Sequence, residues 1–134
     1  MKNCKDKLPL IMTVDDETEI TEFICDYFRA EGFEINGYTD SHTALLALGD
    51  STVLPDVILV DVMMPSIDGY EFSRRLQAEP RLKDITVIFL TGKDRGDDAL
   101  TFLKSGGQLF VKKPFHLSDL KNLILLSTQV GFPT

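Results

Sequence analysis

Four short apolar runs and one weakly alternating segment are separated along the chain by longer segments of mixed polarity. The apolar runs are Leu8–Val14, Val57–Val60, Ile85–Leu90 and Leu109–Val111, and the alternating segment is Phe33–Thr39. Short apolar runs that stop at polar or turn-forming residues are typical of strands. The run at 57–60 contains only Val, Ile and Leu, as expected of a strand that is buried on both faces. The pattern therefore predicts five strands.

The segments between the runs predict helices, because their apolar residues recur at spacings of three and four. The expected helices run from about Thr18 to Gly32, from Ser41 to Gly49, and over Tyr70–Ala78, Asp94–Lys104 and Leu117–Leu126. We expect Asp16, paired with Glu19, to cap the first helix and Ser41 to cap the second. Strands that alternate with helices of about three turns predict an α/β fold with a parallel sheet and helices on both faces.

Polar side chains stand at the carboxyl ends of four of the predicted strands. They are Asp15 and Asp16 after the first strand, Asp61 after the third, Thr91 after the fourth and Lys113 after the fifth. Ligands of such sheets bind beyond these strand ends. Clustered carboxylates repel one another unless a cation lies among them, and oxygen ligands suit Mg²⁺. A lysine and a hydroxyl opposite the ion would complete a cradle for a phosphoryl group.

Composition and charge narrow the classes of function. The 134 residues suit one domain, and the net charge of −7 argues against direct binding of nucleic acid. No apolar run approaches the roughly 20 residues that cross a bilayer, and the N-terminus lacks the apolar core of a signal peptide. We therefore expect a cytoplasmic protein with no membrane contact. Cys4 and Cys25 are expected to be reduced thiols, and His42 and His116 to be surface residues.

The sequence resembles the receiver domains of two-component response regulators from about residue 8 to residue 127. The motifs that carry the resemblance are Val14-Asp15-Asp16, Asp61-Val62-Met63-Met64-Pro65 with Gly69, Thr91, and Phe110-Val111-Lys112-Lys113-Pro114-Phe115. Their order and spacing match the family together. The resemblance implies a doubly wound (βα)5, flavodoxin-like fold with strand order 2-1-3-4-5. It also implies that residues 1–134 form a single receiver domain.

The resemblance further implies the chemistry of the strand ends. Asp61 would accept a phosphoryl group from the phosphohistidine of a sensor histidine kinase or a phosphotransfer protein. Mg²⁺, with Mn²⁺ as the alternative, would be held by Asp61, Asp16 and the backbone carbonyl of Met63, while Asp15 would act mostly through water. Such a chain is a signalling domain that catalyses only its own phosphorylation and dephosphorylation.

The remaining motif residues would respond to the phosphoryl group. Thr91 and Lys113 would hold its oxygens, and the Lys113–Pro114 peptide bond would be cis. Phe110 matches an aromatic switch position that moves inward when Thr91 shifts. The readout would be a downstream protein or an effector domain outside this chain, or a homodimer through the fourth helix, fifth strand and fifth helix. Gly107–Gln108 replaces an acidic pair of one DNA-binding subfamily, which puts that subfamily's charged dimer interface in doubt.

Three other functions are compatible with part of this pattern. An aspartyl-phosphate phosphohydrolase shares the nucleophilic Asp and Mg²⁺, but it has a second Asp where this chain has Met63. A receiver that is never phosphorylated would act only as an interaction module, and it would not need the full set of polar strand ends. A flavin-binding domain would need a phosphate loop rich in hydroxyls and glycine after the first strand, where this chain has Asp15 and Asp16.

Overall fold

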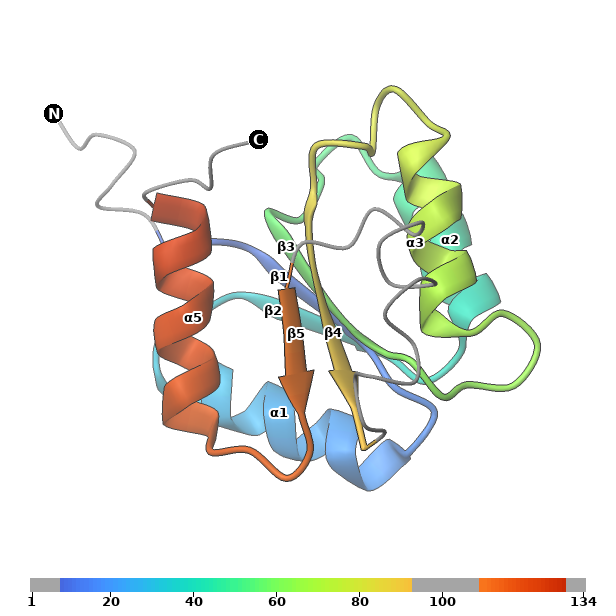
Figure 1. Cartoon of the computed structure of the whole chain (residues 1–134). Helices are drawn as coiled ribbons and strands as arrows, with labels where there is room; N and C mark the ends of the chain where they lie inside the picture. The colour runs from blue at the N-terminus through green and yellow to red at the C-terminus, as the bar shows by residue number, and fades with distance from the viewer. Residues whose placement is uncertain (1–7, 93–108, 130–134) are drawn as a thin grey trace, which may run out of the picture.

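A five-stranded parallel sheet forms the centre of the molecule (Figure 1). The computed structural model describes residues 8–92 and 109–129. The strands are β1 (Ile11–Val14), β2 (Ile35–Tyr38), β3 (Val57–Asp61), β4 (Thr86–Thr91) and β5 (Leu109–Lys112). Their order is β2-β1-β3-β4-β5, and every neighbouring pair is parallel. This confirms the predicted flavodoxin-like order, although β1 and β2 are shorter than the segments that predicted them.

Helices cover both faces of the sheet. They are α1 (Thr18–Ala30), α2 (Ser41–Asp50), α3 (Gly69–Gln77) and α5 (Leu117–Gln129). Figure 1 shows α1 and α5 on one face and α2 and α3 on the other, which confirms the doubly wound class. The helix predicted at 94–104 lies outside the described residues.

The apolar run of β3 is explained by its burial on both faces. Val57 and Leu59 belong to the cluster that packs against α1 and α5, whereas Ile58 and Val60 belong to the cluster under α2 and α3. Successive side chains of a strand point to opposite faces, so a central strand with helices on both sides needs an apolar residue at every position. Asp61 ends this strand at the edge where β1 also ends.

Both predicted helix caps are wrong. The N-cap of α1 is Glu17, and its side chain accepts no capping hydrogen bond. The N-cap of α2 is Asp40, whose carboxylate accepts a hydrogen bond from the Thr43 backbone N–H at 2.9 Å. Ser41 is instead the first helical residue, and its buried hydroxyl donates to the Ile67 carbonyl at 2.8 Å. A tertiary contact therefore uses the hydroxyl that local sequence reasoning assigns to the cap.

Candidate functional site

The end of β1 places two carboxylates beside the sheet. The Asp15 backbone N–H donates to the Tyr38 carbonyl of β2 at 3.0 Å, which extends the pairing of the two strands by one residue. The Asp15 side chain is completely buried, and its Oδ1 accepts a hydrogen bond from the Glu17 backbone N–H at 3.0 Å. Asp16, the next residue, is exposed. The turn after β1 thus holds one carboxylate inside the protein and one at its surface.

The end of β3 places a third carboxylate beside these two. Asp61 is only 4% exposed, and its Oδ1 accepts a hydrogen bond from the Met63 backbone N–H at 3.2 Å. The backbone on either side is held as well, because the Val62 N–H donates to Leu90 of β4 and the Gly69 N–H donates to the Val62 carbonyl. Asp61 therefore stands on a backbone that neighbouring elements hold in position.

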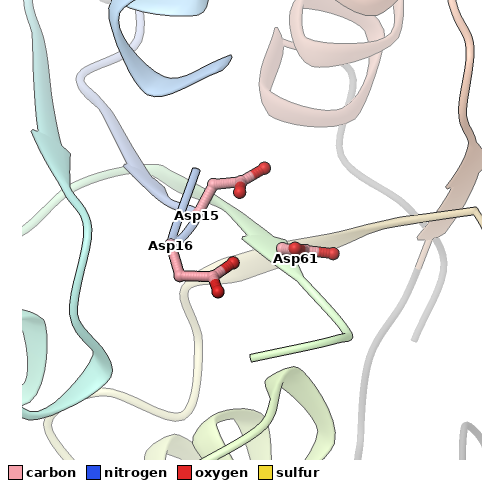
Figure 2. Close-up of side chains that lie close together, drawn as sticks. All are labelled: Asp15, Asp16 and Asp61. Atoms are coloured by element: carbon pink, nitrogen blue, oxygen red, sulfur yellow. The ribbon is translucent and has the colours of Figure 1, made fainter. Parts of the chain in front are cut away.

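Figure 2 shows Asp15, Asp16 and Asp61 grouped at the ends of β1 and β3. One carboxylate oxygen from each residue can be chosen so that all three lie within 4.8 Å of one another. Three carboxylates at this separation repel one another, and a divalent cation among them would remove that repulsion. The donor set consists only of oxygen atoms and remains partly open to solvent through Asp16, which suits Mg²⁺ with its retained waters.

The Lys113 ammonium faces the same carboxylates. Its Nζ lies 3.1 Å from Asp15 Oδ2, 3.7 Å from Asp61 Oδ1 and 3.9 Å from Glu17 Oε1. The lysine backbone is anchored to β4, since its N–H donates to the Thr91 carbonyl at 2.7 Å. The peptide bond between Lys113 and Pro114 is cis. The end of β5 thus brings one cation to the carboxylates at the ends of β1 and β3.

The electrostatic environment of the site raises the pKa of two groups. Burial, and next the negative charge of Asp15, raise the pKa of Asp61 to about 6, although Lys113 and the Met63 N–H act in the opposite direction. Burial by itself would lower the pKa of Lys113, but the attraction of Asp15 and Asp61 outweighs it and the pKa is raised. At neutral pH the site therefore holds an ionised Asp61 and a charged Lys113.

The other predicted residues surround this cluster. Thr91 is completely buried at the end of β4, where it lies beside Lys112 of β5. Phe110 lies on β5 in register with Phe89 and packs, half-buried, against the core under α2 and α3. Met63, two residues after Asp61, is 54% exposed. The roles that the resemblance implies for these residues stay predictions.

Two residues that touch the site were not predicted. Glu17 is largely exposed and brings a third carboxylate to Lys113. Thr21, on the first turns of α1, donates from its buried Oγ1 to the Asp15 carbonyl at 2.8 Å. Their positions two and six residues after Asp15 indicate only weakly that they contact the site, because the first residues of a helix can lie beside the turn that precedes it. The contacts themselves depend on how α1 lies against the sheet.

Comparisons with known proteins agree with this architecture. The family model of the response regulator receiver domain matches residues 11–125. The response regulator SaeR of Staphylococcus aureus (strain USA300) is 31% identical over 110 residues, which are 82% of this chain and 46% of that protein. The chain thus spans about half the length of the curated relatives it matches.

None of the helices in the described residues is both long and apolar enough to span a bilayer.

Solved structures are similar over nearly the whole chain. The receiver domain of a signal transduction histidine kinase from Syntrophus aciditrophicus is 30% identical, with a TM-score of 0.79 over 90% of this chain and 91% of that one. The receiver domain of the Francisella response regulator 1452 is 29% identical, with a TM-score of 0.77 over 90% and 99%. A CheY-like receiver domain protein from Methanospirillum hungatei JF-1, at 21% identity and a TM-score of 0.83 over 93% and 97%, supports the fold alone. The chain belongs to the response regulator receiver domain family.

Proposed function

We propose that this chain accepts a phosphoryl group on Asp61 in a Mg²⁺-dependent reaction and then presents a changed surface to a partner. The donor is the phosphohistidine of a sensor histidine kinase or a phosphotransfer protein. One observation carries the proposal: the Asp61 carboxylate lies within reach both of two further carboxylates, Asp15 and Asp16, and of the Lys113 ammonium at 3.7 Å. This combination supplies a nucleophile, a set of metal ligands and a fixed positive charge at one strand edge.

Asp61 is the nucleophile of the proposed reaction. One of its carboxylate oxygens forms a bond to phosphorus, while the bond from phosphorus to the imidazole nitrogen breaks and its electron pair remains on that nitrogen. With a pKa of about 6, Asp61 is ionised at neutral pH and needs no general base. The reaction requires alignment and neutralisation of charge rather than proton transfer by the protein.

Lys113 and Thr91 bind the phosphoryl oxygens in the proposed reaction. The raised pKa of Lys113 keeps its ammonium charged, and its position between Asp15 and Asp61 brings that charge to the reacting carboxylate. Thr91 ends β4 immediately beside β5, and we assign its hydroxyl to a second phosphoryl oxygen. Both groups would stabilise the negative charge that develops on the outer oxygens of the phosphoryl group during transfer.

Three side chains and one backbone group would hold the metal. Asp16, Asp61 and the Met63 carbonyl would be direct ligands, and Asp15 would act mostly through water; Mn²⁺ is the alternative ion. When bound, the ion neutralises negative charge on the carboxylates and on the phosphoryl oxygens. Asp15 is already paired with Lys113, which supports a less direct role for it than for the exposed Asp16.

The proposed response to phosphorylation involves Thr91 and Phe110. A shift of Thr91 toward the phosphoryl group would leave space for the half-buried Phe110 to turn inward. The surface that includes β5 and α5 would then favour a downstream protein, an effector domain outside this chain, or a second copy of the chain. We further propose that residues 1–134 are a single receiver domain with its core at about 8–127, active in the cytoplasm without direct contact to nucleic acid or membrane.

The decisive experiment is incubation with acetyl phosphate and Mg²⁺, followed by intact mass. We expect the wild-type chain to gain one phosphoryl group, and this gain to disappear in Asp61→Asn and in EDTA. Asp84→Asn is the matched control, because it removes an exposed carboxylate distant in sequence from the site. The same samples on a sizing column report whether phosphorylation produces a dimer.

Two results would overturn the proposal. A mass gain that persists in Asp61→Asn would place the modification on another residue. Failure of the wild-type chain to be labelled by acetyl phosphate and by phosphoramidate would leave the interaction-module function in its place. Steady release of phosphate from a phosphate ester would instead favour the phosphohydrolase.

A further inference from the structure

A single buried hydroxyl joins α1 to the backbone of the acidic turn. Thr21 is 6% exposed, and its Oγ1 donates to the Asp15 carbonyl at 2.8 Å. The Asp15 peptide is also held from the other side, where its N–H donates to Tyr38 of β2. The backbone of this residue is therefore fixed by both a neighbouring strand and a neighbouring helix.

The acceptor chosen by Thr21 is unusual for a helical threonine. Serine and threonine hydroxyls within helices commonly bond to a carbonyl three or four residues earlier in the same helix. This chain contains that common arrangement in α5, where Ser127 and Thr128 both donate to the Ile124 carbonyl. Thr21 instead reaches six residues back to a carbonyl outside its own helix. Its hydroxyl thus forms a hydrogen bond to the turn after β1 and not to a carbonyl of its own helix.

The Thr21 methyl group lies where α1 closely approaches β2. A Cβ added at Gly37 of β2 would lie 2.7 Å from the Thr21 methyl carbon and 2.8 Å from the Cys25 sulfur, so α1 and β2 are in close contact there. The methyl group faces this contact, and a rotation that exchanged the methyl and the hydroxyl would remove the hydrogen bond to Asp15. The Thr21 methyl group thus lies against β2 while its hydroxyl reaches the Asp15 carbonyl.

We propose that Thr21 is a positioning residue for the acidic cluster, holding Asp15 where its carboxylate meets Lys113 and the metal site. The inference rests on the proposed function for the identity of the ion. The position of the Asp15 backbone affects the site because the Asp15 carboxylate accepts a hydrogen bond from the Glu17 N–H and contacts Lys113 Nζ at 3.1 Å. Groups that orient metal ligands from outside commonly change metal affinity by about 10- to 100-fold when they are removed.

The test is a calorimetric titration of the chain with MgCl₂. Thr21→Val retains the shape of the side chain and lacks the hydroxyl, and we expect it to weaken Mg²⁺ binding about tenfold. Thr21→Ala is the second variant, since it removes the hydroxyl without placing a methyl group against the Asp15 carbonyl. Thr21→Ser retains the hydroxyl and should bind Mg²⁺ as the wild type does. Thr128→Val removes a hydroxyl whose bond stays within α5, so it should leave the affinity unchanged.

A second readout needs no metal. The Glu17 amide donates to the Asp15 carboxylate, so its hydrogen exchange reports on the turn. We expect faster exchange in Thr21→Val and Thr21→Ala, and wild-type exchange in Thr21→Ser and Thr128→Val.

The two readouts separate the inference from the proposed function. Wild-type affinity and exchange in both Thr21→Val and Thr21→Ala would overturn the positioning role. Equal losses in Thr21→Ser would overturn it too, because the methyl group and not the hydroxyl would then matter. If the wild-type chain itself binds no Mg²⁺, the proposed metal site fails, and equal Glu17 exchange across the variants would still overturn the role of Thr21.

Discussion

Gly69 lies so close to Asp61 that a Cβ at residue 69 would come within 2.6 Å of the Asp61 carbonyl oxygen. It would also lie 2.9 Å from the Val62 Cα. Both contacts are with backbone, which cannot rotate aside as a side chain can. The start of α3 is therefore packed directly against the turn that carries the proposed phosphoacceptor.

We predict that Gly69→Ala destabilises the chain by about 1–3 kcal/mol, because the added carbon forces the backbone at 61–62 to move. The same movement should weaken Mg²⁺ binding. Urea unfolding and calorimetric titration measure the two effects. Gly49→Ala is the matched control: a Cβ there meets open space within α2, so it should stabilise the chain by about 0.5–1 kcal/mol. A Gly69→Ala chain with wild-type stability would contradict the close contact.

The raised pKa of Asp61 predicts a dependence of stability on pH. The value of about 6 in the folded chain exceeds the ordinary value of about 4, so the folded state binds this proton more tightly than the unfolded state. Between about pH 4 and pH 6, the contribution of Asp61 to the free energy of unfolding therefore falls as pH rises. At neutral pH the ionised carboxylate costs about 3 kcal/mol relative to an unperturbed group.

Asp61→Asn should thus be more stable than the wild type in EDTA at neutral pH, by about 3 kcal/mol. The difference should shrink as the pH is lowered from about 6 toward about 4, and it should vanish below about pH 3, where Asp61 is protonated in both states. Urea unfolding across this pH range measures it, with Asp84→Asn as an exposed control. A difference that grows toward acidic pH would show that the pKa of Asp61 is lowered instead of raised.

Thr13 in β1 is a second site where a polar group lowers stability. Its Oγ1 is fully buried and has no hydrogen-bond partner among the described residues. We predict that Thr13→Val raises the free energy of unfolding by about 1 kcal/mol, since a methyl group replaces an unsatisfied hydroxyl of nearly the same size. Thr13→Ser keeps the hydroxyl and loses the methyl group, so it should destabilise. Stabilisation by both variants, or by neither, would contradict this explanation.

Ser66 adopts a backbone conformation that favours glycine. Its φ of 68° lies in the left-handed region, which costs a residue with a side chain about 1–2 kcal/mol. Ser66→Gly should stabilise the chain by about 0.5–1 kcal/mol, because relief of this strain exceeds the entropy that glycine gains in the unfolded state. Ser118→Gly, in the first turn of α5, should have the opposite sign. Thermal unfolding of the two variants measures both changes in stability, and a loss of stability in Ser66→Gly would argue against backbone strain at this residue.

Much of the fold follows from local patterns in the sequence. The apolar run before Asp61 predicts a central strand because it is short and a strand covered on both faces buries consecutive apolar residues. The spacing of apolar residues at 18–32 predicts a helix that packs against the sheet. Ile24 and Phe28 lie in that core, whereas Phe23, which the same spacing also assigns to it, is exposed. Turn and strand signals of this kind act over a few residues, so they can be recognised without knowing the tertiary structure.

The sequence by itself therefore determined the five strands and the polar residues at their ends. The tertiary structure alone decided which partners these and other polar groups find. Lys113 contacts Asp15 across 98 residues. Ser41 donates to the Ile67 carbonyl instead of capping its helix, and Thr21 donates to a carbonyl outside α1. A side-chain hydrogen bond can be satisfied by several partners with similar energy. The choice among them depends on how the helices lie on the sheet, and that geometry is fixed by packing between residues distant in the chain.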